Sequence, residues 1–154
     1  MQRKPETVEN ITTDGGIQKT ILKEGSGEVI PLGSKAKVHY RGTLEDGTVF
    51  DTSRTRGQPF KFTVGKREVI LGWDKGVATM KKGEVCKLKC APDYAYGSRN
   101  MGPIPANSTL DFEVELLDWT DAGKGGDDGA TGAMVKIVVL LLVLGGVLYF
   151  KFNK

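Results

Sequence analysis

The chain has 154 residues, of which 22 are basic and 19 acidic, so its formal net charge at neutral pH is only +3. A charge this small makes no polyelectrolyte surface, and we expect no nucleic-acid partner. One histidine and two cysteines are too few ligands for a zinc or iron site, and we expect neither a metal nor a cofactor. The length and a hydrophobic content of 39% suit one globular domain with an additional segment.

Alternation of apolar and polar residues with a period of two dominates the chain up to residue 119. It predicts six strands, at residues 17–23, 35–44, 48–53, 60–64, 84–90 and 110–119. Residues 1–16 are mostly polar and lack the apolar core of a secretory signal, so we expect a flexible N-terminal segment and a domain over residues 17–119. Asp46-Gly47 predicts a tight hairpin turn between the second and third strands.

One stretch, residues 68–80, has apolar residues at helical spacing instead. The residues at these steps of three and four are Ile70, Trp73, Val77 and Met80. The spacing predicts one short helix, whose apolar face must be buried against the concave face of an antiparallel sheet, an α+β arrangement. Trp73, its largest apolar residue, is then either a core plug or the floor of a pocket.

Aromatic residues gather on the helix side of the predicted sheet. They are Tyr40, Phe50, Phe60, Trp73 and Phe112. One short helix cannot cover this much aromatic surface, and ligand pockets are usually apolar with a few polar groups. With Asp51 and Tyr96 at its rim, the half-covered face fits such a pocket. The alternative from the residues alone is a well-packed core with Asp51 at the surface.

The cysteines and the histidine offer no catalytic nucleophile or base. Cys86 and Cys90 share one face of a strand, where four residues separate their Cα atoms by roughly 13 Å. A disulfide spans less than about 7 Å, so we expect two buried thiols and a reducing compartment. His39 falls on the outward face of its strand, where we expect it at the surface. A hydrolase or acyl-transfer function is therefore disfavoured.

Residues 91–108 form a long irregular stretch between the last two strands. Loops of this length in compact domains usually carry function or are disordered. The tyrosines Tyr94 and Tyr96 and the proline-flanked Ile104 favour an ordered loop.

Six blocks stand out over residues 16–119. They are VHYRG (38–42), DGTVFDTS (46–53), PFKF (59–62), GKREVILGW (65–73), YAYG (94–97) and FEVELL (112–117). In this order and spacing they resemble the FKBP-type peptidyl-prolyl cis-trans isomerases. The resemblance implies a half-barrel of five to six antiparallel strands wrapped around one short helix. It also implies isomerase activity on X-Pro bonds and binding of macrolides such as FK506 or rapamycin.

The resemblance also implies roles for individual residues. Trp73 would be the pocket floor, and Asp51, the Tyr96 hydroxyl and the Ile70 backbone N–H would contact a substrate or macrolide carbonyl. The residues implied in catalysis are Tyr40, Phe50, Asp51, Trp73, Tyr96 and Phe112, and those implied in ligand binding are Phe60, Glu68, Val69, Ile70 and Ile104. Residues 98–103 are about one residue shorter than in the common small family member. We expect macrolide binding to survive this change, while any ternary contact of the loop tip stays open.

We expect catalysis without a nucleophile. Rotation about an X-Pro bond is slow because amide resonance resists it, with a barrier of about 18–20 kcal/mol for peptide bonds. An apolar pocket that removes water from the polarised planar amide penalises the ground state more than the twisted transition state. The alternative function is a membrane-bound adaptor or chaperone that holds Pro-containing segments without catalysis, and an isomerisation assay separates the two.

The composition changes abruptly after residue 119. Residues 120–132 are rich in glycine and aspartate and predict a flexible linker. Residues 133–150 are all apolar or glycine except for Lys136. Eighteen helical residues rise about 27 Å, close to the hydrocarbon thickness of about 30 Å. We therefore expect residues 133–150 to span the lipid bilayer, followed by a short basic tail at residues 151–154.

This arrangement predicts a single-pass, tail-anchored protein with its catalytic domain in the cytosol. The outer mitochondrial membrane and the endoplasmic reticulum are the two expected locations, and the short span with lysines at both ends favours the former. The linker has a root-mean-square reach of roughly 20 Å. We therefore expect the clients to be Pro-containing membrane proteins or juxtamembrane segments.

Overall fold

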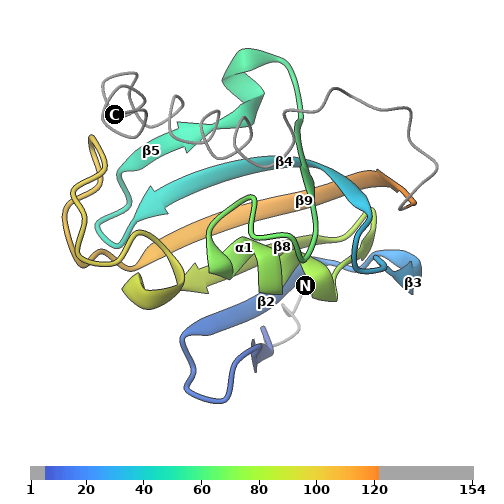
Figure 1. The fold of residues 1–154 in the computed structure, drawn as a ribbon, viewed down its shortest axis with the longest axis horizontal. Helices are drawn as coiled ribbons and strands as arrows, with labels where there is room; N and C mark the ends of the chain where they lie inside the picture. The colour runs from blue at the N-terminus through green and yellow to red at the C-terminus, as the bar shows by residue number, and fades with distance from the viewer. Residues whose placement is uncertain (1–5, 122–154) are drawn as a thin grey trace, which may run out of the picture.

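The computed structural model describes residues 6–121. Within them, most strands form one antiparallel sheet in the order β1-β2-β8-β9-β4-β5, and β6 also pairs with β4 (Figure 1). The strands of this sheet are β1 (Val8–Asn10), β2 (Ile17–Lys23), β4 (Lys35–Leu44), β5 (Val49–Thr52), β6 (Phe60–Thr63), β8 (Val85–Cys90) and β9 (Leu110–Thr120). A second, two-stranded sheet pairs β3 (Ser26–Val29) with β7 (Lys81–Lys82).

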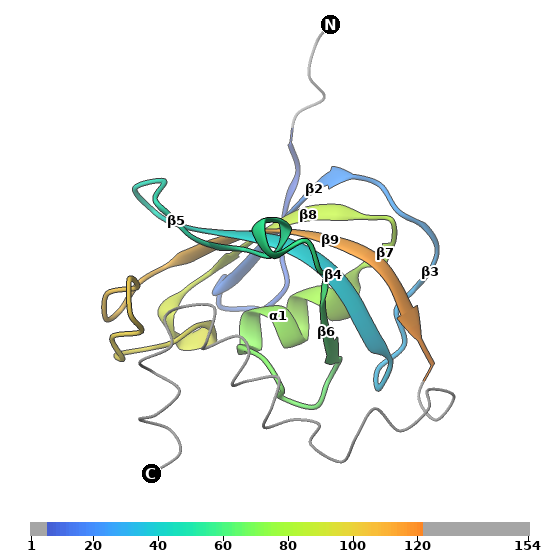
Figure 2. The ribbon, with the colours of Figure 1, turned by 90° about the horizontal axis from the view of Figure 1, so that it is seen from above.

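Strand β9 lies at the centre of the main sheet, between β4 and β8. Its register places Val114 opposite both Tyr40 and Cys86, and Phe112 opposite Leu88. The apolar residues of β9 that alternate along one face are all 1% exposed or less, namely Leu110, Phe112, Val114 and Leu116. Figure 2 shows the sheet curving over the helix, which confirms the predicted antiparallel sheet wrapped around one short helix.

The helix α1 (Leu71–Gly76) is shorter than the predicted stretch of residues 68–80. Ile70 is its N-cap with an extended ψ of 150°, and the residues after it form the 3-10 turn η2 (Val77–Thr79). Glycines bring α1 close to the sheet: a Cβ on Gly72 would lie 2.3 Å from the Cys90 Sγ. The helical spacing therefore located the buried face correctly but overestimated the length of the helix.

The sheet begins before residue 17, where the sequence-based boundary of the domain was placed. Strand β1 pairs antiparallel with β2, with Val8 opposite Thr20, and all three of its residues are exposed. Strands β3 and β7 were also missed, so the prediction of five to six strands is too low. These short strands bury no regular apolar face. Only their backbone pairing with a neighbouring strand defines them, and the apolar pattern of a sequence does not show such pairing.

The loop between β8 and β9 is ordered, as predicted. It starts with the 3-10 turn η3 (Pro92–Tyr94), and the Asn107 N–H donates to the Gly97 carbonyl at 2.8 Å. Met101 and Ile104 form an isolated antiparallel bridge and are 2% and 1% exposed. The loop therefore folds back on itself and buries two side chains.

The predicted anchor at residues 133–150 and the basic tail at residues 151–154 lie outside the described residues, as does the predicted linker apart from residues 120 and 121. In the part that the structure describes, no helix has both the length and the apolar character needed to cross a membrane.

Candidate active site

A cluster of aromatic rings surrounds the fully buried indole of Trp73 on α1. The ring centroids lie 4.8 Å away for Tyr40, 5.3 Å for Phe112, 5.9 Å for Phe62 and 6.0 Å for Phe60. Three of these pairs are edge-to-face, the arrangement that aromatic quadrupoles favour. Strands β4, β6 and β9 thus each place an aromatic residue against the helix, and the predicted shared face of these residues is confirmed.

Phe50 extends this cluster from strand β5. Its ring is half-buried and packs edge-to-face on Phe112 with centroids 5.6 Å apart. The space it occupies exists because residue 42 is a glycine: a Cβ there would lie 2.5 Å from the Phe50 ring and 3.0 Å from Phe112. Sequence reasoning did not single out Gly42, although a glycine inside an alternating strand is a recognised sign of close approach.

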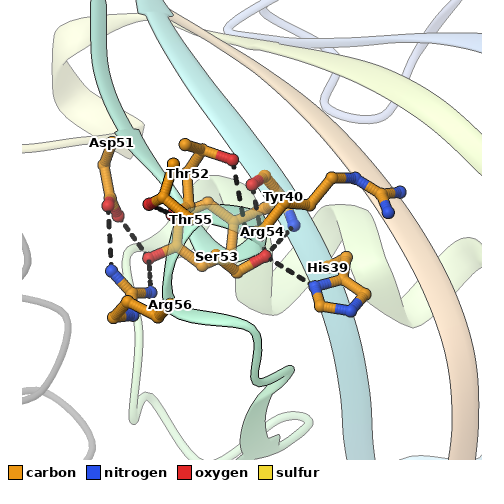
Figure 3. A network of polar contacts seen from close by, with 8 residues as sticks. All are labelled: His39, Tyr40, Asp51, Thr52, Ser53, Arg54, Thr55 and Arg56. Atoms are coloured by element: carbon orange, nitrogen blue, oxygen red, sulfur yellow. Dashed lines mark hydrogen bonds and ion pairs between the residues drawn. The ribbon is translucent and has the colours of Figure 1, made fainter.

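The polar side of the cluster joins Tyr40 to Asp51 and Arg56 (Figure 3). The Tyr40 hydroxyl donates to Asp51 Oδ2. Arg56 Nη2 donates to the Tyr40 hydroxyl at 3.0 Å, and its Nη1 donates to Asp51 Oδ1 at 3.1 Å. The buried carboxylate of Asp51 therefore has a cationic partner in the 3-10 turn η1 (Ser53–Arg56). Arg56 was not predicted, because nothing in its local sequence indicates which carboxylate it meets.

The two tyrosines near this carboxylate remain neutral. Burial raises the pKa of Tyr40, and the hydrogen bond to Asp51 raises it further. Burial also raises the pKa of Tyr96, and the nearby Asp51 carboxylate adds to the shift. An ordinary tyrosine already has a pKa of about 10, so neither phenol is ionised at physiological pH and neither can act as a base. Each can donate a hydrogen bond.

Residues 26–117 match the model of the FKBP-type peptidyl-prolyl cis-trans isomerase family. The chain belongs to this family. It is 57% identical over 103 residues to FK506-binding protein 1 of Dictyostelium discoideum, and 59% identical over 104 residues to peptidyl-prolyl cis-trans isomerase Fkbp12 of Drosophila melanogaster. Each match covers 66% of this chain and 96% of the relative.

A solved structure of the same family has the same fold. The crystal structure of the three FKBP domains of wheat FKBP73 matches with a TM-score of 0.70 and 41% sequence identity, covering 75% of this chain and 51% of that chain. The chain is thus a peptidyl-prolyl cis-trans isomerase of the FKBP type, as the six sequence blocks predicted.

A buried hydroxyl links the isomerase's polar network to the sheet. The Ser53 Oγ accepts from the Tyr40 backbone N–H at 2.8 Å and lies 3.3 Å from the Tyr40 carbonyl oxygen. His39 Nδ1 lies 2.9 Å from the same Oγ, so His39 is half-buried rather than at the surface as expected. Ser53 thereby fixes η1, and with it Arg56, against β4. Figure 3 shows these contacts.

The segment before α1 supplies further predicted residues. Val69 and Ile70 are 7% and 9% exposed. The Ile70 carbonyl accepts from the Trp73 and Asp74 N–H groups at 3.0 Å, whereas its own N–H precedes the helix and has no intrahelical role. Glu68 is 3% exposed, and its Oε2 accepts from the Thr63 N–H at 3.2 Å. The Glu68 side chain is therefore directed at β6.

Both cysteines are free and fully buried, as predicted. Burial raises the pKa of Cys86 and of Cys90 to about 12, so neither is a thiolate at neutral pH. Among residues 6–121, no group of three or more histidine, cysteine, aspartate or glutamate side chains is arranged to hold a metal ion.

Proposed function

We propose that this isomerase accelerates rotation about X-Pro bonds by holding the amide in the aromatic cluster and excluding water from it. The observation that carries the proposal is the convergence of rings from three strands on Trp73, at centroid distances of 4.8 to 6.0 Å. A planar amide has a polarised carbonyl that water stabilises, and this polarisation is lost when the bond twists. An apolar site therefore favours the twisted form, which is the requirement for catalysis.

The polar groups then have supporting roles. We assign the walls to Phe50, Phe60 and Phe112, and the floor to Trp73. The neutral Tyr96 hydroxyl and the Ile70 N–H donate to the substrate carbonyl groups. Asp51, paired with Arg56, stabilises the charge distribution of the twisted amide without taking a proton. Val69 and Ile104 complete the apolar surface.

An isomerisation assay on an X-Pro peptide tests this mechanism. Phe50→Ala should lower kcat/KM more than Asp51→Asn, because the lost ring admits water while the amide of asparagine still accepts a hydrogen bond from Tyr40. A fall of about a hundredfold corresponds to about 2.7 kcal/mol of transition-state stabilisation. Val49→Ala is the matched control, because Val49 precedes Phe50 on β5 and is 42% exposed. The reverse order of effects would make charge chemistry central.

The same pocket is proposed to bind macrolides such as FK506 or rapamycin. Support comes from the 57% identity to FK506-binding protein 1 of Dictyostelium discoideum. Calorimetric titration with FK506 should give one site per chain, and the macrolide should compete with the X-Pro peptide. Binding that leaves isomerase activity intact would separate the two sites.

A single-pass anchor at residues 133–150 is proposed to hold the isomerase at the outer mitochondrial membrane or the endoplasmic reticulum, with residues 17–119 in the cytosol. The apolar run of residues 137–150 supports the span, and the free thiols of Cys86 and Cys90 suit a reducing compartment. The protein should resist extraction at alkaline pH and lose this resistance when residues 133–154 are deleted. A glycosidase-sensitive mass shift at either sequon, Asn10 or Asn107, would contradict the cytosolic orientation.

In this location the clients are proposed to be Pro-containing membrane proteins or juxtamembrane segments. Linker length supports this, because residues 120–132 reach only roughly 20 Å. Holding of such segments without turnover is the second candidate function. Phe50→Ala separates the roles in cells, because a client that requires catalysis should mature poorly with this variant even when it still binds.

A further inference from the structure

The N-terminal segment before β2 contacts the loop that follows β8. The Tyr94 hydroxyl donates to Asp14 Oδ2 at 2.7 Å, although the two residues are 80 positions apart in the chain. The other carboxylate oxygen, Asp14 Oδ1, accepts from the Thr12 hydroxyl at 2.6 Å and from the Gly16 N–H at 2.9 Å. Asp14 is therefore held from its own side of the contact as well as by Tyr94.

The contact includes close packing of the Tyr94 ring. A Cβ on Gly16 would lie 2.2 Å from Tyr94 Cε2, so only glycine leaves room for the ring at this position. The Gly16 carbonyl accepts from the Ala91 N–H at 2.8 Å, directly where the loop begins. The segment and the loop thus meet through a hydrogen bond between side chains, a backbone hydrogen bond and a ring that covers a glycine.

Tyr94 also lies next to two parts of the pocket. Its carbonyl oxygen would be 3.0 Å from a Cβ on Gly72, the residue that precedes Trp73 in α1. Tyr96 follows two residues later, and the loop returns through the hydrogen bond from the Asn107 N–H to the Gly97 carbonyl. A shift of Tyr94 therefore displaces the loop that carries Tyr96 relative to the helix that carries Trp73.

We propose that Asp14 and Tyr94 form a clamp that positions residues 91–108, so that both are positioning residues for the Tyr96 and Ile104 side of the pocket. The proposal rests on the pocket assigned above. Without the clamp, the loop populates more conformations in the free enzyme, and substrate binding has to order it. The cost of this ordering weakens substrate binding, so KM rises. Bond rotation in the fully bound complex is nearly unchanged, so kcat stays the same.

The ionisation of Asp14 strengthens the clamp. Hydrogen bonds from Thr12, Tyr94 and the Gly16 N–H lower the pKa of Asp14 to about 2. The carboxylate is therefore charged throughout the pH range of an isomerase assay, and hydrogen bonds to a charged acceptor are stronger than neutral ones. A lowered pKa means that this contribution is present above the unfolded value and is lost only as the pH falls toward about 2.

The test is a double-mutant cycle of Asp14→Ala and Tyr94→Phe in the full chain, read as KM and kcat for an X-Pro peptide. Each single variant should raise KM by about three- to tenfold and change kcat by less than about twofold. The KM of the double variant should be no higher than that of the more severely affected single variant, because both substitutions remove the same contact. Asp14→Asn keeps an acceptor at the same place and should recover part of the lost affinity.

Asp46→Ala is the matched control. Asp46 is also an exposed aspartate that accepts a backbone N–H, from Thr48 at 2.9 Å, but it lies in the β4–β5 hairpin. It should leave KM unchanged. Hydrogen exchange at the Gly97 and Asn107 amides should accelerate in Asp14→Ala and slow again when the peptide is bound.

Two results would overturn the clamp. One is a lower melting temperature of Asp14→Ala with unchanged KM and unchanged exchange in residues 91–108, which would make the contact structural only. The other is additive effects in the double variant. Phe50→Ala distinguishes the two proposals: if it lowers kcat/KM while Asp14→Ala and Tyr94→Phe do not, the pocket stands and the clamp fails. If Asp14→Ala does not fold, Tyr94→Phe alone decides, because it keeps the ring over Gly16.

Discussion

The two walls of the proposed pocket are built in different ways. On the sheet and helix side, Tyr40, Trp73 and Phe112 are 1% exposed or less and come from regular elements packed on one another. On the loop side, Tyr96 is half-buried. The loop buries Met101 and Ile104, and the rest of it is held by single backbone hydrogen bonds and the contact of Tyr94 with Asp14.

The difference follows from the energetics of the two kinds of contact. Removing a fully buried aromatic side chain costs about 3–5 kcal/mol, whereas a typical hydrogen bond contributes about 0.5–1.5 kcal/mol. The sheet wall therefore determines stability and shape, and it opens only when the domain unfolds. The loop wall can open locally, so it is the side where substrate affinity can change without loss of the fold.

The largest expected effect is on the sheet wall itself. Trp73→Ala removes the residue at the centre of the ring cluster and should lower the free energy of unfolding by about 3–5 kcal/mol. Isomerase activity should be lost as well. Trp119→Ala is the control, because Trp119 is only half-buried and lies outside the ring cluster, and its cost should be clearly smaller. Denaturant unfolding measures both, and equal costs would contradict the central role of Trp73.

A buried ion pair away from the pocket separates stability from activity. Lys19 Nζ lies 2.8 Å from Glu84 Oε2 and also donates to the Thr79 carbonyl at 3.2 Å, and the two side chains are 2% and 3% exposed. Lys19→Met leaves the Glu84 charge buried without its partner and should destabilise the domain by about 3 kcal/mol. The kcat/KM of the folded protein should stay unchanged. Lys19→Met with Glu84→Leu should recover most of the stability.

Gly42→Ala changes the sheet wall without removing a ring. The new methyl group would lie 2.5 Å from the Phe50 ring, so Phe50 has to move away from Phe112. We expect a loss of about 1–3 kcal/mol in unfolding free energy. The kcat/KM should fall about tenfold, which corresponds to about 1.4 kcal/mol. Thr43→Ala, at the next position of the same strand, provides the control. Full activity of Gly42→Ala would show that the position of Phe50 is not critical.

Tyr96→Phe tests the loop wall with a smaller change. Because the pKa of Tyr96 is raised, its hydroxyl is a neutral donor whose loss affects only a hydrogen bond to the substrate. We expect KM to rise by a few-fold and the unfolding free energy to change by less than about 0.5 kcal/mol. Peptide titration and thermal unfolding measure the two effects. A large loss of stability would place Tyr96 with the sheet wall instead.

The smallest expected effect is that of pH on the isomerase rate. The kcat/KM should vary by less than about threefold between about pH 6 and 8.5, whereas acid-base catalysis would give a bell-shaped profile. A bell-shaped rate profile would contradict the desolvation mechanism.

The stability of the domain should fall at higher pH. The thiols of the unfolded chain ionise near 9.0, but burial raises the pKa of Cys86 and Cys90 to about 12. Their contribution is therefore complete below about 9 and is lost as the pH rises toward 12.

The sequence by itself determined the features that repeat locally. Alternation located six of the strands and placed Tyr40, Phe60 and Phe112 on one face, because side chains of a strand point to opposite sides with a period of two. Helical spacing located Trp73 on the buried side of α1. The six family blocks identified the isomerase, since they combine these patterns with pocket residues in a fixed order.

Only the tertiary structure decided which distant polar groups meet. Asp14 and Tyr94 are 80 positions apart, Lys19 and Thr79 are 60 apart, and each residue taken alone has the pattern of an exposed side chain. Arg56 and the Ser53 hydroxyl likewise acquire their roles only when η1 packs beside β4. Polar contacts of this kind depend on the register and curvature of the assembled sheet. Local periodicity predicts which face of an element is buried, but it does not predict which distant side chain a polar group contacts.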